Sequence, residues 1–259
     1  MPIILTLALA TNVSGQDSVR SYLGVSFGGS DFHLKDMHAS PLIFSSIGIA
    51  PTLQFLYQGD EDQHYAEVSY FYDYLGTSTD NFSVANHRAR IRCAYLHSIT
   101  GFNLLGEVVE FSAGGSINSF LCYSEYYYQY IPPNNARGLE TWLWSNSMDL
   151  SVRFDHRTSP QEFFAVLLYV PLLSSVSRPA YSTSGFYNYD VNDWKFHQFG
   201  KIEVFPRNFS TDVIFIFQRP LVGSFNLQIN YEWYYSIYSV PKTINMYMNN
   251  LRAGIGYCF

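Results

Sequence analysis

Hydrophobic and polar residues alternate with a period of two along most of this chain, which is the pattern of a β-strand with one apolar face. We expect a strand in each of ten segments: 22–28, 47–58, 66–74, 88–95, 103–119, 142–154, 162–173, 213–217, 225–235 and 249–259. The orientation of two of these stays open. In 103–119, Glu107 and Glu110 fall on opposite faces, and 162–173 is apolar on both faces.

The connections between these segments alternate in length. Short turns at one end and long loops at the other are typical of a transmembrane β-barrel with its long loops outside. An even number of strands brings both ends of the chain to the periplasmic side. Twelve strands are possible if Gly114 and Gly115 form a hairpin turn, whereas a separate strand over 194–206 would give an odd count and is rejected. We expect short connections near 59–62, 99–102, 157–161 and 219–223, and long ones near 30–44, 77–86, 121–139, 174–208 and 237–247.

Composition favours a membrane barrel over a soluble barrel or sandwich, whose strands would alternate similarly. Aromatic residues make up 18% of the chain and charged residues only 14%, against about 25% charged in ordinary soluble domains. Apolar runs outside the N-terminus are too short for a membrane helix, which needs about 18 residues or more. The acidic net charge of −6 and the lack of a basic cluster beyond three arginines argue against a nucleic-acid partner. The sequence therefore predicts an all-β fold, a transmembrane antiparallel up-and-down barrel.

The two ends of the chain add information on location. Residues 1–15 have the apolar core of a secretion signal, and with such a signal the barrel would occupy 16–259. An N-terminal strand or plug is the alternative for 1–15. The last expected strand has one apolar face and ends on Tyr257 and Phe259. It resembles the closing strand of Gram-negative outer-membrane barrels. That resemblance implies an outer-membrane location and recognition of Tyr257 and Phe259 by the barrel-insertion machinery.

Two internal stretches carry a second, looser resemblance. Residues 170–181 read VPLLSSVSRPAY and residues 230–235 read NYEWYY. Both resemble segments of uncharacterised outer-membrane barrels of the Bacteroidetes type. The resemblance covers roughly 100–259 and implies a fold and a compartment, but no activity.

Charged residues recur on the polar faces of the strands, so the barrel model points them inward. Three arginines at alternate positions of 88–95 form a column, and carboxylates on neighbouring strands face the same side. Charges in a narrow lumen must be paired or hydrated. We expect an ion-pair network that fills the barrel, with an anion-selective lining as the alternative. Its members are Arg88, Arg90, Arg92, Glu67, Asp73, Asp149, Arg153, Glu232 and Arg252.

Catalytic candidates are few. Asp31, His33, Asp36 and His38 fall in the first expected loop, where a carboxylate could hold a histidine as general base. That pattern is similar to the omptin proteases, which are ten-stranded barrels, but no second Asp pair accompanies it. An enzyme that modifies lipid of the outer leaflet would need a Ser beside a His. The candidate pairs, His97 with Ser98 and His156 with Ser159, lie near short turns, which are on the periplasmic side. No set of residues has metal-ligand spacing, and no cofactor is expected.

The long loops are rich in aromatic rather than charged residues. These aromatics could extend strands beyond the membrane, stack on a sugar or peptide, or dock another outer-membrane protein. The aromatic surface comprises Tyr123, Tyr126, Tyr127, Tyr128, Tyr181 and Tyr187. The sequence thus predicts a non-enzymatic structural or accessory barrel, or a narrow channel, in contact with outer-membrane lipid. A hydrolase at the rim, either omptin-like or lipid-modifying, is the alternative.

Overall fold

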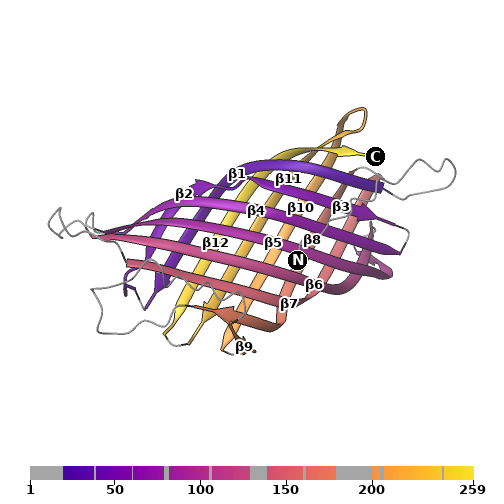
Figure 1. Cartoon of the computed structure of the whole chain (residues 1–259). Coiled ribbons are helices and arrows are strands. Elements are labelled where there is room, and N and C mark those ends of the chain that lie inside the picture. The colour runs from indigo at the N-terminus through magenta and orange to yellow at the C-terminus, as the bar shows by residue number, and fades with distance from the viewer. Residues whose placement is uncertain are drawn as a thin grey trace, which may run out of the picture.

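The computed structural model describes residues 20–37, 39–59, 61–78, 82–104, 107–128, 139–159, 162–178, 200–204, 207–240 and 242–259. These residues contain twelve β-strands (Figure 1): β1 (Arg20–Asp36), β2 (Phe44–Ile49), β3 (Thr52–Gln58), β4 (Asp62–Gly76), β5 (Phe82–Leu104), β6 (Glu107–Tyr128), β7 (Leu139–Ser159), β8 (Glu162–Ser177), β9 (Lys201–Glu203), β10 (Asn208–Val222), β11 (Phe225–Tyr238) and β12 (Ile244–Cys258). No helix among them is long and apolar enough to cross a membrane. The predicted secretion signal at 1–15 lies outside the described residues.

The strands form one antiparallel sheet that closes on itself. From β4 to β8 and from β10 to β12, strands adjacent in the chain pair with each other, β12 pairs with β1, and β8 pairs with β10. Strands β2 and β3 lie between β1 and β4 in one continuous register, and the interruption falls at Pro51, which has no N–H to donate to the ladder. The wall therefore has ten strand positions, as the alternation predicts. Strand β9 pairs only with the end of β8.

Register sets the tilt of the strands. Following paired residues once around the wall from Phe259, just after β12, leads back to Tyr247, twelve residues earlier in the chain. For ten strands, this shift corresponds to a tilt of about 40° and a backbone radius of about 10 Å. The crossing of the front and back walls in Figure 1 reflects this tilt. Side chains from opposite walls can therefore meet near the barrel axis.

Three expectations about the connections need correction. The hairpin at Gly114 and Gly115 does not form, because both residues lie within β6, opposite Leu96 and Tyr95. The short turn expected at 99–102 is also wrong, since β5 continues to Leu104. The long-loop end is more ordered than expected. Strands β1, β5, β6, β8, β11 and β12 extend into the ranges taken as loops. In β6 the alternation continues there with tyrosines in place of aliphatic residues.

Every strand presents an apolar face outward and a polar or mixed face inward. The outward side chains include Phe27 (67% exposed), Ile117 (65%) and Leu251 (60%). The two strands whose orientation stayed open now have one: Phe120 of β6 and Leu167 of β8 point inward and are buried. An apolar outer belt on a closed sheet is the arrangement that a bilayer requires, because all backbone groups are paired within the protein.

The interior is layered along the barrel axis. Towards the long loops, an apolar cluster contains Phe32, Phe71, Phe120, Tyr234 and Met248 among others. Towards the short turns, a second cluster contains Tyr22, Tyr65, Phe163, Leu167 and Ile216 among others. The arginines of β5 and their carboxylate partners lie between the two clusters, and each of these side chains is less than 5% exposed. We call the three parts the outer apolar layer, the polar layer and the inner apolar layer.

The small residues of the last strand have a packing role. The ring of Tyr22 lies against Gly256, where an added Cβ would come within 2.0 Å of that ring. The Tyr22 hydroxyl donates a hydrogen bond to Gln228 Oε1 (2.8 Å). Gly256 of β12 thus makes room for an aromatic side chain of the inner apolar layer.

Candidate functional site

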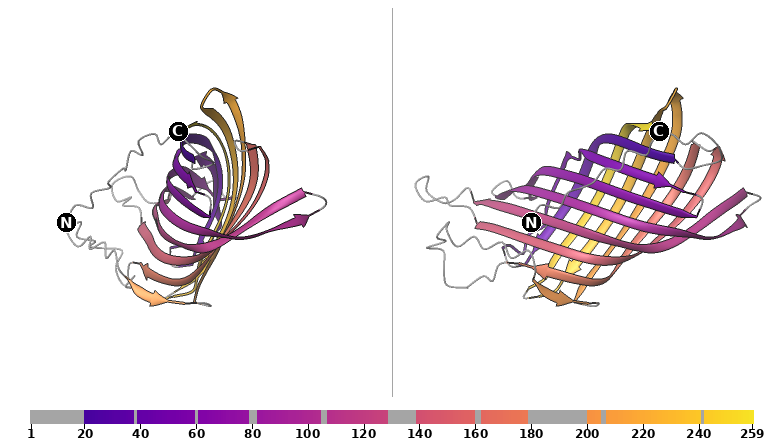
Figure 2. Two further views of the ribbon diagram at one scale, coloured as in Figure 1. Left: turned by 90° about the vertical axis from the view of Figure 1, so that its right-hand side faces the viewer. Right: turned by 45° about the vertical axis from the view of Figure 1, so that its right-hand side comes forward.

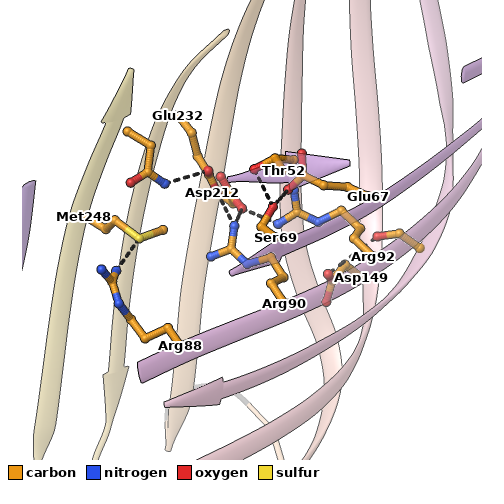
Figure 3. A network of polar contacts seen from close by, with 12 residues as sticks. Thr52, Glu67, Ser69, Arg88, Arg90, Arg92, Asp149, Asp212, Glu232 and Met248 are labelled. Atoms are coloured by element: carbon orange, nitrogen blue, oxygen red, sulfur yellow. Dashed lines mark hydrogen bonds and ion pairs between the residues drawn. The ribbon is translucent and has the colours of Figure 1, made fainter. Parts of the chain in front are cut away.

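The centre of the polar layer is the arginine column of β5 (Figure 3). Arg88, Arg90 and Arg92 occupy alternate positions of the strand, so all three point into the barrel, and each is at most 1% exposed. The same strand has Val84 before the column and Leu96 after it. The period-two pattern therefore places three cations between two apolar layers.

Each arginine of the column has a carboxylate partner. Arg88 pairs with Asp73 of the neighbouring strand β4. Arg90 pairs with Glu232 of β11 and with Asp212 of β10 (3.0 Å), and Arg92 pairs with the same Asp212. Since β10 and β11 lie on the other side of the barrel, the pairs of Arg90 and Arg92 cross the lumen.

A fourth arginine extends the network from β12. Arg252 is fully buried and lies 3.2 Å from Glu232 Oε2 and 3.5 Å from Glu67 Oε2. Glu67 also accepts hydrogen bonds from Tyr65 (2.6 Å) and Gln54 (3.1 Å). Glu232 is therefore shared between two arginines, and charge-assisted hydrogen bonds link β4, β5, β10, β11 and β12.

Aromatic rings bracket the arginine column. The Arg88 guanidinium lies 3.7 Å from the centroid of the Phe32 ring. Arg90 lies 4.8 Å from the Tyr234 ring and Arg92 lies 4.1 Å from the Tyr169 ring. Cation–π contacts of this kind are strongest where the cation is removed from water. The apolar layers thus contribute directly to holding the charges.

The remaining predicted members of the network lie inward but take different partners. Arg153 pairs with Asp155 through two hydrogen bonds of 2.7 and 2.6 Å, separately from the column. Asp149 is 5% exposed and accepts a hydrogen bond from Ser116 (3.5 Å). Within the described residues, Asp149 has no ion pair. All nine predicted residues are thus buried, and eight of them form ion pairs.

Two members of the network are absent from the sequence prediction. Asp212 bridges Arg90 and Arg92, and Asp155 pairs with Arg153. The signal for both was present in the alternation. Asp212 directly precedes Val213, which faces outward, so the alternation points Asp212 inward. Asp155 is two residues after Arg153 and therefore lies on the same inward face.

A further ion pair spans the mouth of the barrel at the long-loop end. Arg178, just after β8, pairs with Asp36 at the end of β1 and donates a hydrogen bond to the carbonyl of Lys242 (2.8 Å). Thr141 also donates to Asp36 (3.2 Å). Side chains of β1, of β7 and of the residue after β8 therefore meet a backbone carbonyl of the β11–β12 connection above the outer apolar layer.

The catalytic candidates of the first segment are divided between the two faces of the wall. His33 Nε2 lies 3.2 Å from Asp31 Oδ1, and both side chains lie on the outer face of β1, which is a strand here and not a loop. Asp36 points inward and is engaged by Arg178. His38 lies outside the described residues. The structure therefore separates the carboxylate of Asp36 from the Asp31–His33 pair.

The serine–histidine candidates are also apart. His97 Nδ1 lies 2.9 Å from Asp62 Oδ1. His156 Nδ1 lies 3.4 Å from the carbonyl of Val108, and Ser159 accepts a hydrogen bond from the Glu162 N–H. Among the described residues, no serine lies within hydrogen-bond distance of His97 or His156.

The predicted aromatic surface belongs partly to β6 and not to a loop. Tyr123 and Tyr127 point outward and donate hydrogen bonds to Glu125 (2.9 and 2.6 Å). The bond from Tyr127, followed by that from Tyr123, lowers the pKa of the Glu125 carboxyl. Tyr126 is buried and packs edge-on against Phe44, so it is not part of a surface. Tyr128 ends β6, and Tyr181 and Tyr187 lie outside the described residues.

The chemistry of a metal site is not assembled in the part of the chain that the structure describes. No three His, Cys, Asp or Glu side chains there are close enough to hold an ion together. Among the described residues no disulfide joins the three cysteines, and Cys93 is exposed whereas Cys122 is buried.

Comparison with known proteins gives a fold and no family. No family model matches the chain, and no curated protein matches it either. Among solved structures, the outer membrane protease OmpT from Escherichia coli is similar with a TM-score of 0.50 at 8% identity, over 94% of this chain and 97% of that chain. The translocator domain of the autotransporter NalP from Neisseria meningitidis has a TM-score of 0.49 at 9% identity, over 94% and 90%.

The fold and the surface chemistry lead to one conclusion. The chain has the closed antiparallel architecture of OmpT, and its outward faces are apolar around the wall. The chain therefore has the fold of an integral outer-membrane β-barrel. The identity of 8% carries the fold alone, so the Bacteroidetes origin suggested by the sequence remains a prediction.

Proposed function

We propose that this protein is a non-conducting outer-membrane barrel, a structural or accessory component and not a channel or an enzyme. The observation that carries the proposal is the burial of the arginine column. Arg88, Arg90 and Arg92 are at most 1% exposed, although they lie in the middle of the lumen. An ion-conducting lumen would leave such charges in contact with water.

The way the ion pairs cross the lumen supports the proposal. Arg90 reaches Glu232 and Asp212 on other strands of the wall, and apolar layers lie on both sides of this contact. Aromatic rings of both layers contact the guanidinium groups. Ions passing through would have to displace paired charges and two packed apolar layers.

Conductance across a planar lipid bilayer tests the proposal. We expect the native protein to give no stable conductance steps. Arg90→Ala should create discrete steps, because it removes a large side chain at the centre of the polar layer. Ile91→Ala is the matched control, since it changes the next residue on the lipid side. Stable ion conductance by the native protein would overturn the proposal.

We further propose that the long-loop end forms the functional surface, through contact with a partner or ligand. Support comes from the outward part of β6 beyond the apolar belt, where Tyr123 and Tyr127 hold the Glu125 carboxylate between them. Tyr74 of β4 stacks against Tyr127 (6.4 Å between centroids). This wall presents rings and hydroxyl groups, which suit another outer-membrane protein.

Insertion into the membrane would use the terminal strand. Tyr257 and Phe259 face outward, 47% and 55% exposed, with their rings stacked at 6.2 Å. We propose that the barrel-insertion machinery recognises this pair. Replacing both with Ser should reduce the amount of protein in the outer-membrane fraction of cells, whereas Phe225→Ser on the neighbouring strand should not. Equal amounts for all three proteins would contradict this role.

A further inference from the structure

The β5–β6 hairpin has a free strand edge at the short-turn end of the barrel. Strand β4 begins at Asp62, opposite His97, and the last backbone contact on that side is Ser98 N–H to Glu61 C=O (2.7 Å). Strand β5 continues to Leu104 and pairs there only with β6. Within the described residues, 99–104 therefore has no neighbour on its β4 side. Both views of Figure 2 show the hairpin extending past the adjacent strands.

This edge carries neither of the two residue types that most often prevent pairing. Backbone N–H and C=O groups alternate between the two sides of a strand, so several of them in 99–104 point away from β6. Natural sheet edges are usually protected by charged residues, especially Lys, or by Pro. The segment 99–104 contains neither a charged residue nor a proline. It can therefore accept an additional strand.

Apolar side chains accompany the free backbone groups. Ile99 is 57% exposed, Phe102 is 40% exposed and Leu104 is 54% exposed. On β6, Val108 is 60% exposed. A β-bulge between Ser98 and Thr100 separates this part of β5 from the membrane wall, and bulges commonly redirect a strand at the rim of a barrel. An incoming strand would gain both backbone hydrogen bonds and apolar contacts.

The charges around the edge are negative. Glu61 lies at its base, Glu107 lies at its tip, and both are exposed. The other carboxylates of this region already have partners: Asp62 contacts His97, and Glu110 pairs with Arg157 (3.2 Å). Complementary charge steers association and selects the partner. The occupant should therefore carry basic residues.

We infer that residues 99–104 of β5 bind an extended, basic segment of a periplasmic partner protein, which joins the sheet as an additional strand. In this mode of recognition, main-chain hydrogen bonds supply affinity and alternate side chains supply specificity. The side of the membrane follows from the short turns, which are periplasmic in such barrels. The inference does not depend on whether the lumen conducts ions.

The test uses the full-length protein in phosphatidylcholine nanodiscs and fluorescently labelled peptides. The first peptide has eight residues that alternate Lys and Val, and the second replaces each Lys with Glu. A third keeps the Lys–Val sequence but carries a methyl group on every backbone nitrogen, which removes the hydrogen-bond donors from both edges of the peptide strand. We expect the first peptide to bind at least about 10-fold more tightly than either of the others. Empty nanodiscs report any binding to lipid.

A double variant locates the site. Glu61→Lys with Glu107→Lys should weaken the Lys–Val peptide by about 10-fold or more, because it reverses the charge at both ends of the edge. Glu162→Lys at the start of β8 is the matched control and should leave binding unchanged. Equal binding of the N-methylated peptide would overturn strand addition. An unchanged affinity in the double variant would overturn the assigned site. A dimer that persists in sedimentation after the peptide is added would show that a second copy of this protein, and not a partner protein, occupies the edge.

Discussion

The two faces of β5 are built for different surroundings. On the inner face, Arg88, Arg90 and Arg92 are almost completely buried. On the outer face, which is separated from them only by the thickness of the strand, Ile91 is 54% exposed and Cys93 is exposed. A soluble protein has the opposite arrangement. The same alternation therefore supplies an apolar surface for lipid and a polar layer for the lumen.

The comparison also shows that the two faces depend on different parts of the chain. The outer face needs only apolar side chains, since lipid accepts any of them. The inner face needs specific partners, and these come from distant strands: Arg90 contacts Glu232, 142 positions further along the chain. We therefore expect a single substitution on the inner face to cost more than one on the outer face.

The largest effect is expected for Glu232→Ala. Glu232 is fully buried and accepts hydrogen bonds from Arg90, Arg252 and Asn250. Removing its carboxylate leaves two arginines short of a partner, and breaking a buried ion pair costs about 3–5 kcal/mol. Urea unfolding of the protein in lipid vesicles measures this loss. Ser236→Ala, also inward on β11, is the control and should change the free energy of unfolding by less than about 1 kcal/mol.

A loss below about 1 kcal/mol in Glu232→Ala would contradict this comparison. It would mean that Asp212 and Glu67 can neutralise Arg90 and Arg252 without Glu232. The double variant Glu232→Ala with Arg90→Ala separates the two cases. If the unpaired charge causes the loss, removing Arg90 as well should recover part of it.

On the outer face, Ile91→Arg should have the next largest effect. Ile91 lies in the apolar belt of β5, and an arginine facing lipid near the bilayer midplane costs about 2–4 kcal/mol. Ile99→Arg is the control on the same strand, beyond the last contact with β4, where the cost should fall to about 0–1 kcal/mol. Unfolding in vesicles measures both. Equal losses at the two positions would show that Ile91 does not face hydrocarbon.

The sequence was sufficient for the faces of eight of the ten expected strands but not for the partners across the lumen. Alternation alone points Arg88, Arg90 and Arg92 inward, and composition shows which face meets lipid. Register around the wall decides which carboxylate meets which arginine, and it depends on pairings between β8, β10 and β11 that no local pattern encodes. Asp212 was overlooked for the same reason, although the alternation alone predicts that its side chain points inward. The free edge of β5 was hidden too, since it depends on where β4 begins.

The smallest effect is expected for an ion pair outside the polar layer. Glu110 and Arg157 lie 3.2 Å apart at the short-turn end, and their side chains are 44% and 28% exposed. Exposed pairs contribute about 0–1 kcal/mol and are screened by salt. Glu110→Ala should therefore lower the free energy of unfolding by less than about 1 kcal/mol, and the difference should vanish at high salt. The loss in Glu232→Ala should persist at high salt, because ions do not reach the polar layer. If salt removed both losses alike, water and ions would have to enter the lumen, and the contrast between the inner face and the exposed rim would fail.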